Sequence, residues 1–516
     1  MNKGQGCVRI VKVPVPRLGN NIADVERLAG VLKEELATGR VSISLEVMKG
    51  LPLLLRRCNH RVKLILFREA WGWKVAGVKA PDAEEPVCGV ALDMGTTRLV
   101  ARLIDLETGQ ALGELGFDNP QISIAPDVLA RIHHAGKPGG LEELRSVLID
   151  SINSCVETLC KGAGCGVESV YSMACAGNTA ITHLFMGIDP SNIIREPYIP
   201  AVNFPGTLDA RDLGLCLNPG AGVFIFPNIG SYFGGDLVAG ILFSGLHTKE
   251  NPSILVDVGT NAEVVLGTKE WLIACAGAAG PALEGGMSKM GMMAGPGVID
   301  RVAIDPQSCE IKVHTIGDEP AVGICGSAMI DLAAGLFLSG MMDIRGKFVL
   351  ERCADRLVQE AGIDTFVVVP AKESETGFPI TLSQVDLNSL TSSKAAMYTI
   401  LQVMVEHTAG MSFEDLEHFY VAGTFGSFID PGSAISIGML PDIPMDRFKV
   451  LGNSSLEGAA LFMNNPDLLD EIEIIRQRLT YVELNVNQEF MNIFSGAKFY
   501  PHTDRSRFPS VTGYLL

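Results

Sequence analysis

The chain has 516 residues, enough for two to four domains with a large buried core. Hydrophobic residues make up 47% and charged residues 19% of it, which is typical of a globular protein and excludes a disordered one. The net charge of -18 argues against a general nucleic-acid binder, because neutralising phosphates requires clustered Lys and Arg.

The N-terminal sequence MNKGQGCVRIVKVPVPRLG contains no apolar core of signal-peptide length, so we expect a cytoplasmic protein without a membrane segment. One stretch, Gly323 to Met342, is apolar, but it carries Asp331 near its middle. An Asp at the bilayer centre costs roughly 2.5–3.5 kcal/mol on insertion scales, so this stretch predicts a buried helix.

The twelve cysteines include no C-x-x-C pair, which predicts reduced thiols. The closest approach to a metal-binding pattern is Cys155, Cys160 and Cys165. Metal and iron–sulfur sites usually need pairs two residues apart and a fourth ligand, so we predict no metal there.

Residues 1–86 predict a small separate α/β domain. An amphipathic helix is expected over Asp24–Leu36 and a second helix over Glu46–Arg57. Strands are expected over Val62–Phe67 and Trp73–Val78. The polar, proline-flanked sequence PDAEEP follows as a linker.

The next segment, CGVALDMGTTRLVARLIDLETGQ, predicts a strand, a tight turn and a second strand. About 160 residues later the sequence SILVDVGTNAEVVLGTKE repeats this pattern and aligns Asp257 with Asp93. Such a repeat predicts an α/β protein with two similarly folded halves, 87–250 and 251–516. Together they would form one two-lobed domain, 87–516.

A D-x-G-T turn suits phosphate chemistry, although a single copy is also simply a good hairpin corner. Glycine lets the backbone approach a ligand closely, and the turn N–H groups form an anion site. The aspartate is an acceptor that suits hydrated Mg²⁺. Two such turns facing each other would clamp a polyphosphate and orient an attacking water.

A third segment, FYVAGTFGSFIDPGSAISIGMLP, contains a strand from Phe419 to Val421 that runs into a glycine-rich turn. Glycine-rich backbone beside an aromatic ring suits packing against a nucleobase or ribose. Alone this signal is weak.

Together the three segments resemble the ATPase superfamily of acetate and sugar kinases, heat-shock ATPases and actin. Its motifs occur in the order phosphate 1, phosphate 2 and adenosine. The residues that match them are Asp93, Gly95, Thr96 and Thr97, then Asp257, Gly259, Thr260 and Asn261, then Gly423, Thr424, Phe425 and Gly426. The resemblance implies a two-lobed actin-like fold that binds ATP and Mg²⁺, with Asp93 and Asp257 near the metal and in catalytic positions.

Longer segments resemble the reductive activators of corrinoid proteins, over nearly the whole chain from about Val8 to Val511. They are DNPQISIAPDVLARI, GNTAITHLFMG, SYFGGDLVAGIL, AGAAGPALEGGMSKMGMMAGPGVID, GICGSAMID and ELNVNQEFMNIFSGAKFYPHTD. This resemblance implies a homodimer that couples ATP hydrolysis to reduction of the Co(II) corrinoid of a partner protein to Co(I).

The chain departs from the family in its first residues. Family members carry an N-terminal [2Fe–2S] ferredoxin domain with C-x4-C-x2-C spacing. Residues 1–86 hold only Cys7 and Cys58, and they resemble the family's linker, so we predict no intrinsic iron–sulfur cluster. Either a separate ferredoxin delivers the electrons, or ATP serves another purpose, or the chain is truncated.

Two further residues are candidates. Asp236, in FGGDLVAG, is either a helix N-cap or a catalytic group near Mg²⁺ and the γ-phosphate. Glu284 lies in a loop that resembles the family's nucleotide-side loop, which implies adenosine contact. Two other functions remain open: a small-molecule kinase of the same superfamily, and a nucleotide-switched scaffold that binds a corrinoid protein.

Overall fold

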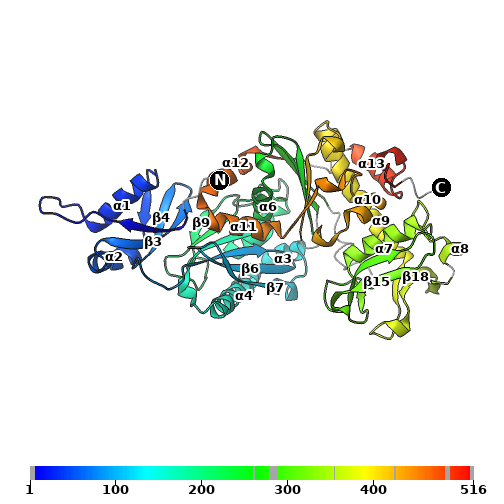
Figure 1. Ribbon diagram of the computed structural model, residues 1–516, viewed down its shortest axis with the longest axis horizontal. Coiled ribbons are helices and arrows are strands. Elements are labelled where there is room, and N and C mark those ends of the chain that lie inside the picture. Colours follow the sequence, from blue (N-terminus) through cyan, green and yellow to red (C-terminus); the bar gives the residue numbers. More distant parts are fainter. Residues whose placement is uncertain are drawn as a thin grey trace. The chain divides into compact units, whose positions relative to one another are not determined.

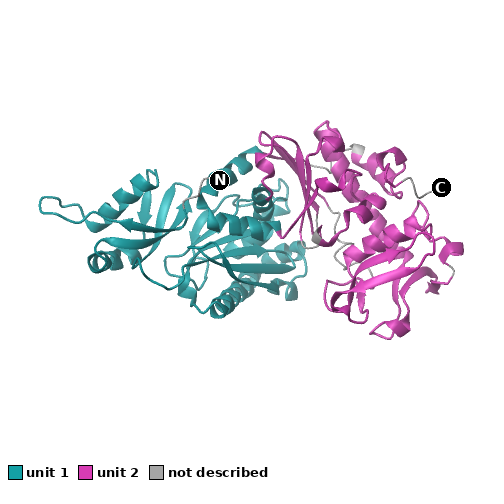
Figure 2. Cartoon of the chain, in the orientation of Figure 1, with its two compact units in different colours: residues 1–243, 454–478 teal, residues 244–453, 479–516 magenta. Residues whose placement is uncertain are grey.

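The computed structural model describes residues 6–259, 262–277, 289–353, 355–423, 426–482 and 488–511. The chain forms two compact units (Figure 2). The first contains residues 1–243 and 454–478, and the second contains residues 244–453 and 479–516. The predicted second half was 251–516, whereas residues 454–478 belong to the first unit. The chain therefore passes between the units three times.

The N-terminal module is a four-stranded sheet in the order β1-β3-β4-β2 with two helices (Figure 1). Its elements are β1 (Val8–Lys12), α1 (Asp24–Glu35), β2 (Val41–Ile43), α2 (Leu45–Arg57), β3 (Arg61–Glu69) and β4 (Gly72–Lys79). Leu28, Leu51 and Leu64 are among the residues of a core that joins both helices to the sheet. These helices and strands confirm the predictions to within a few residues.

The first unit continues with a six-stranded sheet in the order β7-β6-β5-β8-β10-β9. Its strands are β5 (Cys88–Met94), β6 (Arg98–Asp105), β7 (Ala111–Asp118), β8 (Val170–Gly177), β9 (Gly206–Asp209) and β10 (Gly222–Ile225). The central strand β5 runs antiparallel to β6 and parallel to β8. Strands β5 and β8 are almost wholly buried, as expected of apolar strands covered on both faces.

Helices accompany this sheet and carry polar residues at their N-termini. They are α3 (Val128–Ala135), α4 (Gly140–Gly162), α5 (Thr179–Met186), α6 (Gly235–Ser244), α11 (Ser454–Asn464) and α12 (Leu469–Arg478). Leu148 and Ile152 of α4 share a core with Val90 and Leu103 of the sheet. Helix α11 packs against β5 and β8.

The second unit contains a sheet in the order β21-β20-β11-β12-β13-β22. Its strands are β11 (Ser253–Val258), β12 (Ala262–Gly267), β13 (Leu272–Gly277), β20 (His418–Ala422), β21 (Phe448–Gly452) and β22 (Leu479–Tyr481). Strand β11 runs antiparallel to β12 and parallel to β20, just as β5 does with β6 and β8. The predicted repeat is therefore present in the pairing of the strands.

Among the described residues, two small sheets and five α-helices also belong to the second unit. The strands are β14 (Val298–Ile304), β15 (Ile311–Thr315), β16 (Gly323–Ile324), β17 (Leu357–Glu360), β18 (Ile363–Val369) and β19 (Ile380–Ser383). The helices are α7 (Gly326–Leu338), α8 (Leu350–Cys353), α9 (Gln384–Gln402), α10 (Pro431–Ser436) and α13 (Gln488–Ala497). Helix α7 is almost entirely buried, which confirms the prediction for the apolar stretch around Asp331. Within the described ranges, every helix is too short or too polar to cross a membrane.

Candidate nucleotide site

The turn after β5 places Asp93, Gly95, Thr96 and Thr97 at the carboxyl end of the first sheet. Asp93 lies opposite Ala176 of β8 and is partly exposed. A Cβ atom at Gly95 would lie 2.4 Å from the carbonyl oxygen of Arg98, so only glycine fits this corner. The Asp93 carboxylate therefore lies at the end of a buried strand, next to a turn whose backbone no side chain at position 95 covers.

Three polar side chains hold this turn in place. Asn119 Nδ2 donates a hydrogen bond to the carbonyl of Gly95 at 2.9 Å. The buried guanidinium of Arg131 donates to the carbonyl of Thr96 at 2.7 Å, and Asn178 Nδ2 donates to Thr96 Oγ1 at 3.1 Å. Burial lowers the pKa of Arg131 to about 10. The turn is thus preorganised by groups that the sequence did not single out for this role.

The N-termini of α5 and α6 lie at the same end of the sheet. Asn178 caps α5 by accepting a hydrogen bond from the Ile181 N–H at 3.0 Å. A Cβ atom at Gly234 would lie 2.3 Å from Cα of Asn178 and 2.5 Å from Asp236 Oδ1. Glycine at position 234 therefore lets the start of α6 pack directly against the start of α5.

Asp236 lies in the first turn of α6, near Asp93. Its Oδ1 accepts a hydrogen bond from the Leu237 N–H at 2.8 Å. Burial, with a smaller contribution from the negative charge of Asp93, raises the pKa of Asp236 to about 6. The N-cap alternative is wrong, because α6 begins at Gly235 and Asp236 is the second residue inside the helix. The alternative of a catalytic group near Mg²⁺ stays a prediction.

Ser455 of α11 is a further candidate site residue, which no sequence motif marks. Its Oγ donates a hydrogen bond to Asp93 Oδ1 at 2.8 Å, across 362 positions of sequence. Helix α11 begins at Ser454, the residue at which the chain re-enters the first unit from the second. No local pattern around Ser455 carries this information, since the contact exists only because α11 returns to β5.

The second unit presents the matching turn after β11. Asp257 ends this strand opposite Ala422 of β20 and is partly exposed. Gly423 has φ +88°, and a Cβ atom there would lie 2.8 Å from Asp257 Oδ1. The Gly423 N–H donates to the carbonyl of Gly452 at 3.0 Å. Asp257 and the glycine-rich turn after β20 therefore lie side by side, as the two motifs would if they served one ligand.

The remaining predicted residues divide into two groups. Gly259 and Gly426 are described, and a Cβ atom at Gly426 would lie 2.8 Å from Val421 Cγ1. Five predicted residues lie outside the described residues: Thr260, Asn261, Glu284, Thr424 and Phe425.

The first-unit residues suit a hydrated magnesium ion with a polyphosphate. Two carboxyl groups close enough for one to raise the pKa of the other form a site where a cation relieves their repulsion. Mg²⁺ commonly uses one or two carboxylates and keeps several waters. The described residues hold no set of three or more His, Cys, Asp or Glu side chains that could hold a metal ion by themselves. The glycine corners at 95 and 234 leave backbone open to phosphate oxygens.

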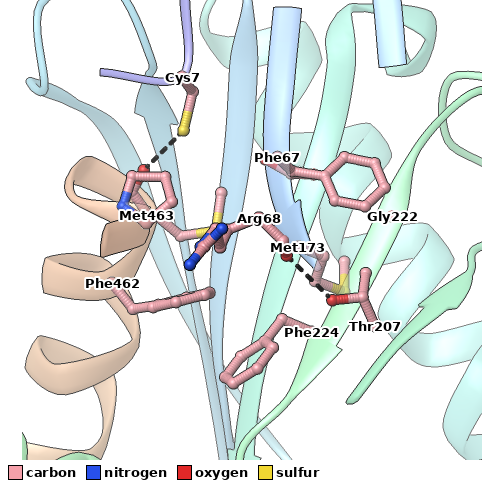
Figure 3. A pocket seen from close by; sticks show the side chains of 11 residues that line it. Cys7, Phe67, Arg68, Met173, Thr207, Gly222, Phe224, Phe462 and Met463 are labelled. Carbon is pink, nitrogen blue, oxygen red and sulfur yellow. Dashed lines mark hydrogen bonds between the residues drawn. The ribbon is translucent and has the colours of Figure 1, made fainter. Parts of the chain in front are cut away.

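A small pocket elsewhere in the first unit has a different character (Figure 3). It lies between the N-terminal module and the first sheet, and Phe67, Phe224 and Phe462 line it. Cys7 Sγ donates to the Met463 carbonyl at 3.3 Å, and Thr207 Oγ1 donates to the Arg68 carbonyl at 3.4 Å. Its walls are mostly apolar and carry no carboxylate, so this is a packing junction that fixes the module to β10 and α11.

Comparison with known proteins shows the family to which the chain belongs. Family models described as the RACo linker region, the RACo middle region and the C-terminal ASKHA domain of RACo match residues 8–85, 88–249 and 251–512. The corrinoid activation enzyme RamQ of Eubacterium limosum is 30% identical over 425 residues, 81% of this chain and 71% of that protein. A [Co(II) methylated amine-specific corrinoid protein] reductase of Methanosarcina barkeri is 25% identical over 446 residues, 79% of this chain and 76% of that protein.

A solved structure described as a reductive activator for corrinoid, iron–sulfur protein superposes with a TM-score of 0.87 at 36% identity. It covers 99% of this chain and 81% of that chain. Together with the match to the ASKHA domain, this confirms the predicted two-lobed actin-like fold. The chain belongs to the family of RACo-type reductive activators of corrinoid proteins.

Proposed function

We propose that this chain uses the binding and hydrolysis of MgATP to return the Co(II) corrinoid of a partner protein to Co(I), with electrons from an external low-potential donor such as a ferredoxin. The observation that carries the ATP part is the Asp93–Asp236 pair beside the glycine corners at the end of β5. The names of the related proteins from Eubacterium and Methanosarcina support the corrinoid part.

Each residue of the site has a defined task in this proposal. Bound Mg²⁺ would neutralise phosphate charge and polarise the bond that breaks. Asp93, held by Ser455, positions a water ligand of the metal, and Asp236 accepts a proton from the attacking water. A pKa of about 6 leaves Asp236 ionised and still basic enough for that task at neutral pH. Asp257, which lies beside Gly423, is the second candidate to orient the metal or the attacking water.

ATP contributes to reduction through conformation. A ligand shifts an equilibrium only by its differential affinity for the two states. MgATP therefore has to favour a state that binds the Co(II) corrinoid protein and alters the coordination of its cobalt. Hydrolysis then releases the partner, because ADP and phosphate no longer hold that state together.

An anaerobic visible spectrum tests the proposal. A Co(II) corrinoid protein is mixed with this chain, MgATP and a low-potential reductant, and controls omit either ATP or the chain. We expect the Co(I) band only in the complete mixture. ATP turnover without Co(I) would refute the coupling, and turnover stimulated by a small alcohol or acid would favour a kinase.

A further inference from the structure

The N-terminal module differs sharply in charge from the rest of the chain. Residues 1–86 contain 15 Lys and Arg and nine Asp and Glu, a formal charge of +6. Residues 87–516 contain 26 Lys and Arg and 50 Asp and Glu, a formal charge of -24. A charge asymmetry of this size points to an interaction surface on the smaller part.

Some of the basic residues of the N-terminal module form ion pairs with the rest of the first unit. Lys63 pairs with Glu107 at 2.8 Å and Lys74 pairs with Asp209 at 2.5 Å, and both pairs hold the module against the rest of the unit. These bases are mostly covered, so they serve attachment. The exposed bases lie elsewhere on the module.

Several exposed bases gather at the end of the module where β1 stops. Lys12 lies directly opposite Arg61 in the β1–β3 pair, and the Val13 N–H donates to the His60 carbonyl at 2.8 Å. Because like charges directly opposite each other destabilise a strand pair, the Lys12–Arg61 pair does not serve the stability of the sheet. Arg57, at the end of α2, is exposed nearby.

The loop of residues 13–23 belongs to the same end. It leaves β1 beside Arg61 and enters α1 at Asp24, which Arg56 of α2 contacts at 2.6 Å. Arg27 holds the loop by donating to the Ile22 carbonyl at 2.9 Å. Figure 1 shows the loop extending beyond α1. The loop and the end of α2 thus form one continuous surface. Asp24 on this surface is paired with Arg56, and Glu26 is a second acidic residue there.

This surface combines apolar and basic side chains. Four apolar residues there are at least half exposed: Val15, Leu18, Ile22 and Leu53. Four exposed bases accompany them: Lys12, Arg17, Arg57 and Arg61. We term these eight residues the basic end. An exposed apolar group with a charged rim is the usual composition of a protein-binding surface.

We propose that the basic end docks an acidic iron–sulfur protein that carries electrons, an inference that rests on the proposed function. A cluster held by four thiolates is negatively charged in both redox states, so its carrier presents negative charge near the cluster. The acidic remainder of the chain repels such a carrier, and the basic end attracts it. Docking raises the concentration of the carrier near the bound corrinoid protein.

Binding of a purified plant-type [2Fe–2S] ferredoxin to the full chain tests this docking without ATP or corrinoid. We expect weak binding by anaerobic titration calorimetry that decreases as salt rises. The double substitution Arg57→Glu with Arg61→Glu should weaken it about tenfold, and Leu18→Ser should weaken it several-fold. The matched control, Lys33→Glu with Arg40→Glu, makes the same charge change at the far end of α1 and should alter binding less than threefold.

Two outcomes would overturn the docking site. One is equal weakening by the test and control substitutions, which would show only a net-charge effect. The other is binding to anionic phospholipid vesicles with no ferredoxin binding, which would make the basic end a membrane contact. An unchanged melting temperature of the variants shows that they remain folded.

Cobalt reduction separates this inference from the proposed function. With titanium(III) citrate as donor, the Arg57→Glu, Arg61→Glu variant should form Co(I) as fast as the unaltered chain. With ferredoxin as donor, it should be slower by about the same factor as its loss of affinity. A chain that binds ferredoxin at the basic end but never forms Co(I) would refute the proposed function and leave the docking site standing.

Discussion

At the level of single residues, Asp93 and Asp236 are the two candidate carboxyl groups of the first unit. Asp93 ends a buried strand, and Asp236 begins a helix that packs against the same end of the sheet. Burial and the charge of Asp93 raise the pKa of Asp236 from 3.8 to about 6. Burial is the larger cause, and the negative charge of Asp93 makes ionisation of Asp236 less favourable still.

Replacing Asp236 by Asn should stabilise the chain without nucleotide at pH 8. Because the folded pKa lies above the unfolded one, the native state binds more protons between about pH 4 and 6, and stability falls as pH rises through that window. Above it, removing the charge should add about 1–3 kcal/mol and raise the melting temperature by several degrees. At pH 4 the difference should shrink towards zero.

Calorimetric melting curves from pH 4 to 8 check this, with Asp118→Asn as a control because Asp118 is exposed at the end of β7. A lower melting temperature for Asp236→Asn at every pH would show instead that the ionised carboxylate is needed for folding. ATP hydrolysis by Asp236→Asn should fall by a factor on the order of 100 if Asp236 is the general base.

Asp93→Ala should weaken the dependence on magnesium. Removing the carboxylate takes away a group that positions water ligands of Mg²⁺, so the Mg²⁺ concentration for half-maximal ATP hydrolysis should rise on the order of tenfold. A titration of hydrolysis rate against Mg²⁺ at fixed ATP measures it. If the midpoint stays where it is in the unaltered chain, Asp93 does not serve the metal.

Helix α11 connects several parts of the first unit at the level of elements. Ser455 near its start bonds Asp93, and Arg102 of β6 forms a two-pronged ion pair with Glu457. Near its end, the Met463 carbonyl accepts the thiol of Cys7 from the N-terminal module. A shift of α11 would therefore change contacts both at Asp93 in the candidate nucleotide site and at Cys7 in the N-terminal module.

Ser455→Ala and Ser454→Ala form a matched pair that tests this role of α11. Ser455 donates to a carboxylate, whereas the buried Oγ of Ser454 makes no hydrogen bond among the described residues. Ser455→Ala should raise the Mg²⁺ midpoint several-fold, because Asp93 loses a bond worth about 1.5–3 kcal/mol. Ser454→Ala should leave the Mg²⁺ midpoint unchanged. If both substitutions raise the midpoint equally, Ser455 contributes only to the packing of α11.

The sequence predicted the parts of this architecture that repeat or alternate. The apolar strands around Asp93 and Asp257, and helices α1 and α2, follow local periodicity, so their positions are right to within a few residues. Ser455, Asn178 and Arg131 were not assigned to the turn, because their contacts join segments far apart in the chain. The return of residues 454–478 to the first unit was missed for the same reason.

At the scale of the whole molecule, the chain passes from the second unit to the first between Asn453 and Ser454. On one side of this crossing, the Gly452 carbonyl accepts the N–H of Gly423, beside Asp257. On the other side, Ser455 bonds Asp93. Two residues of chain, Asn453 and Ser454, thus separate a contact of one predicted phosphate turn from a contact of the other.

A double-mutant cycle tests whether Asp93 and Asp257 serve one nucleotide. If both groups act on the same MgATP, Asp257→Ala should leave ATP bound and slow hydrolysis strongly, and adding Asp93→Ala should cost much less than it does alone. The expected interaction energy is of order 1–3 kcal/mol from hydrolysis rates under saturating ATP. Additive losses would mean that the two turns work independently. In that case the proposed coupling of ATP hydrolysis to cobalt reduction would need another element of the fold.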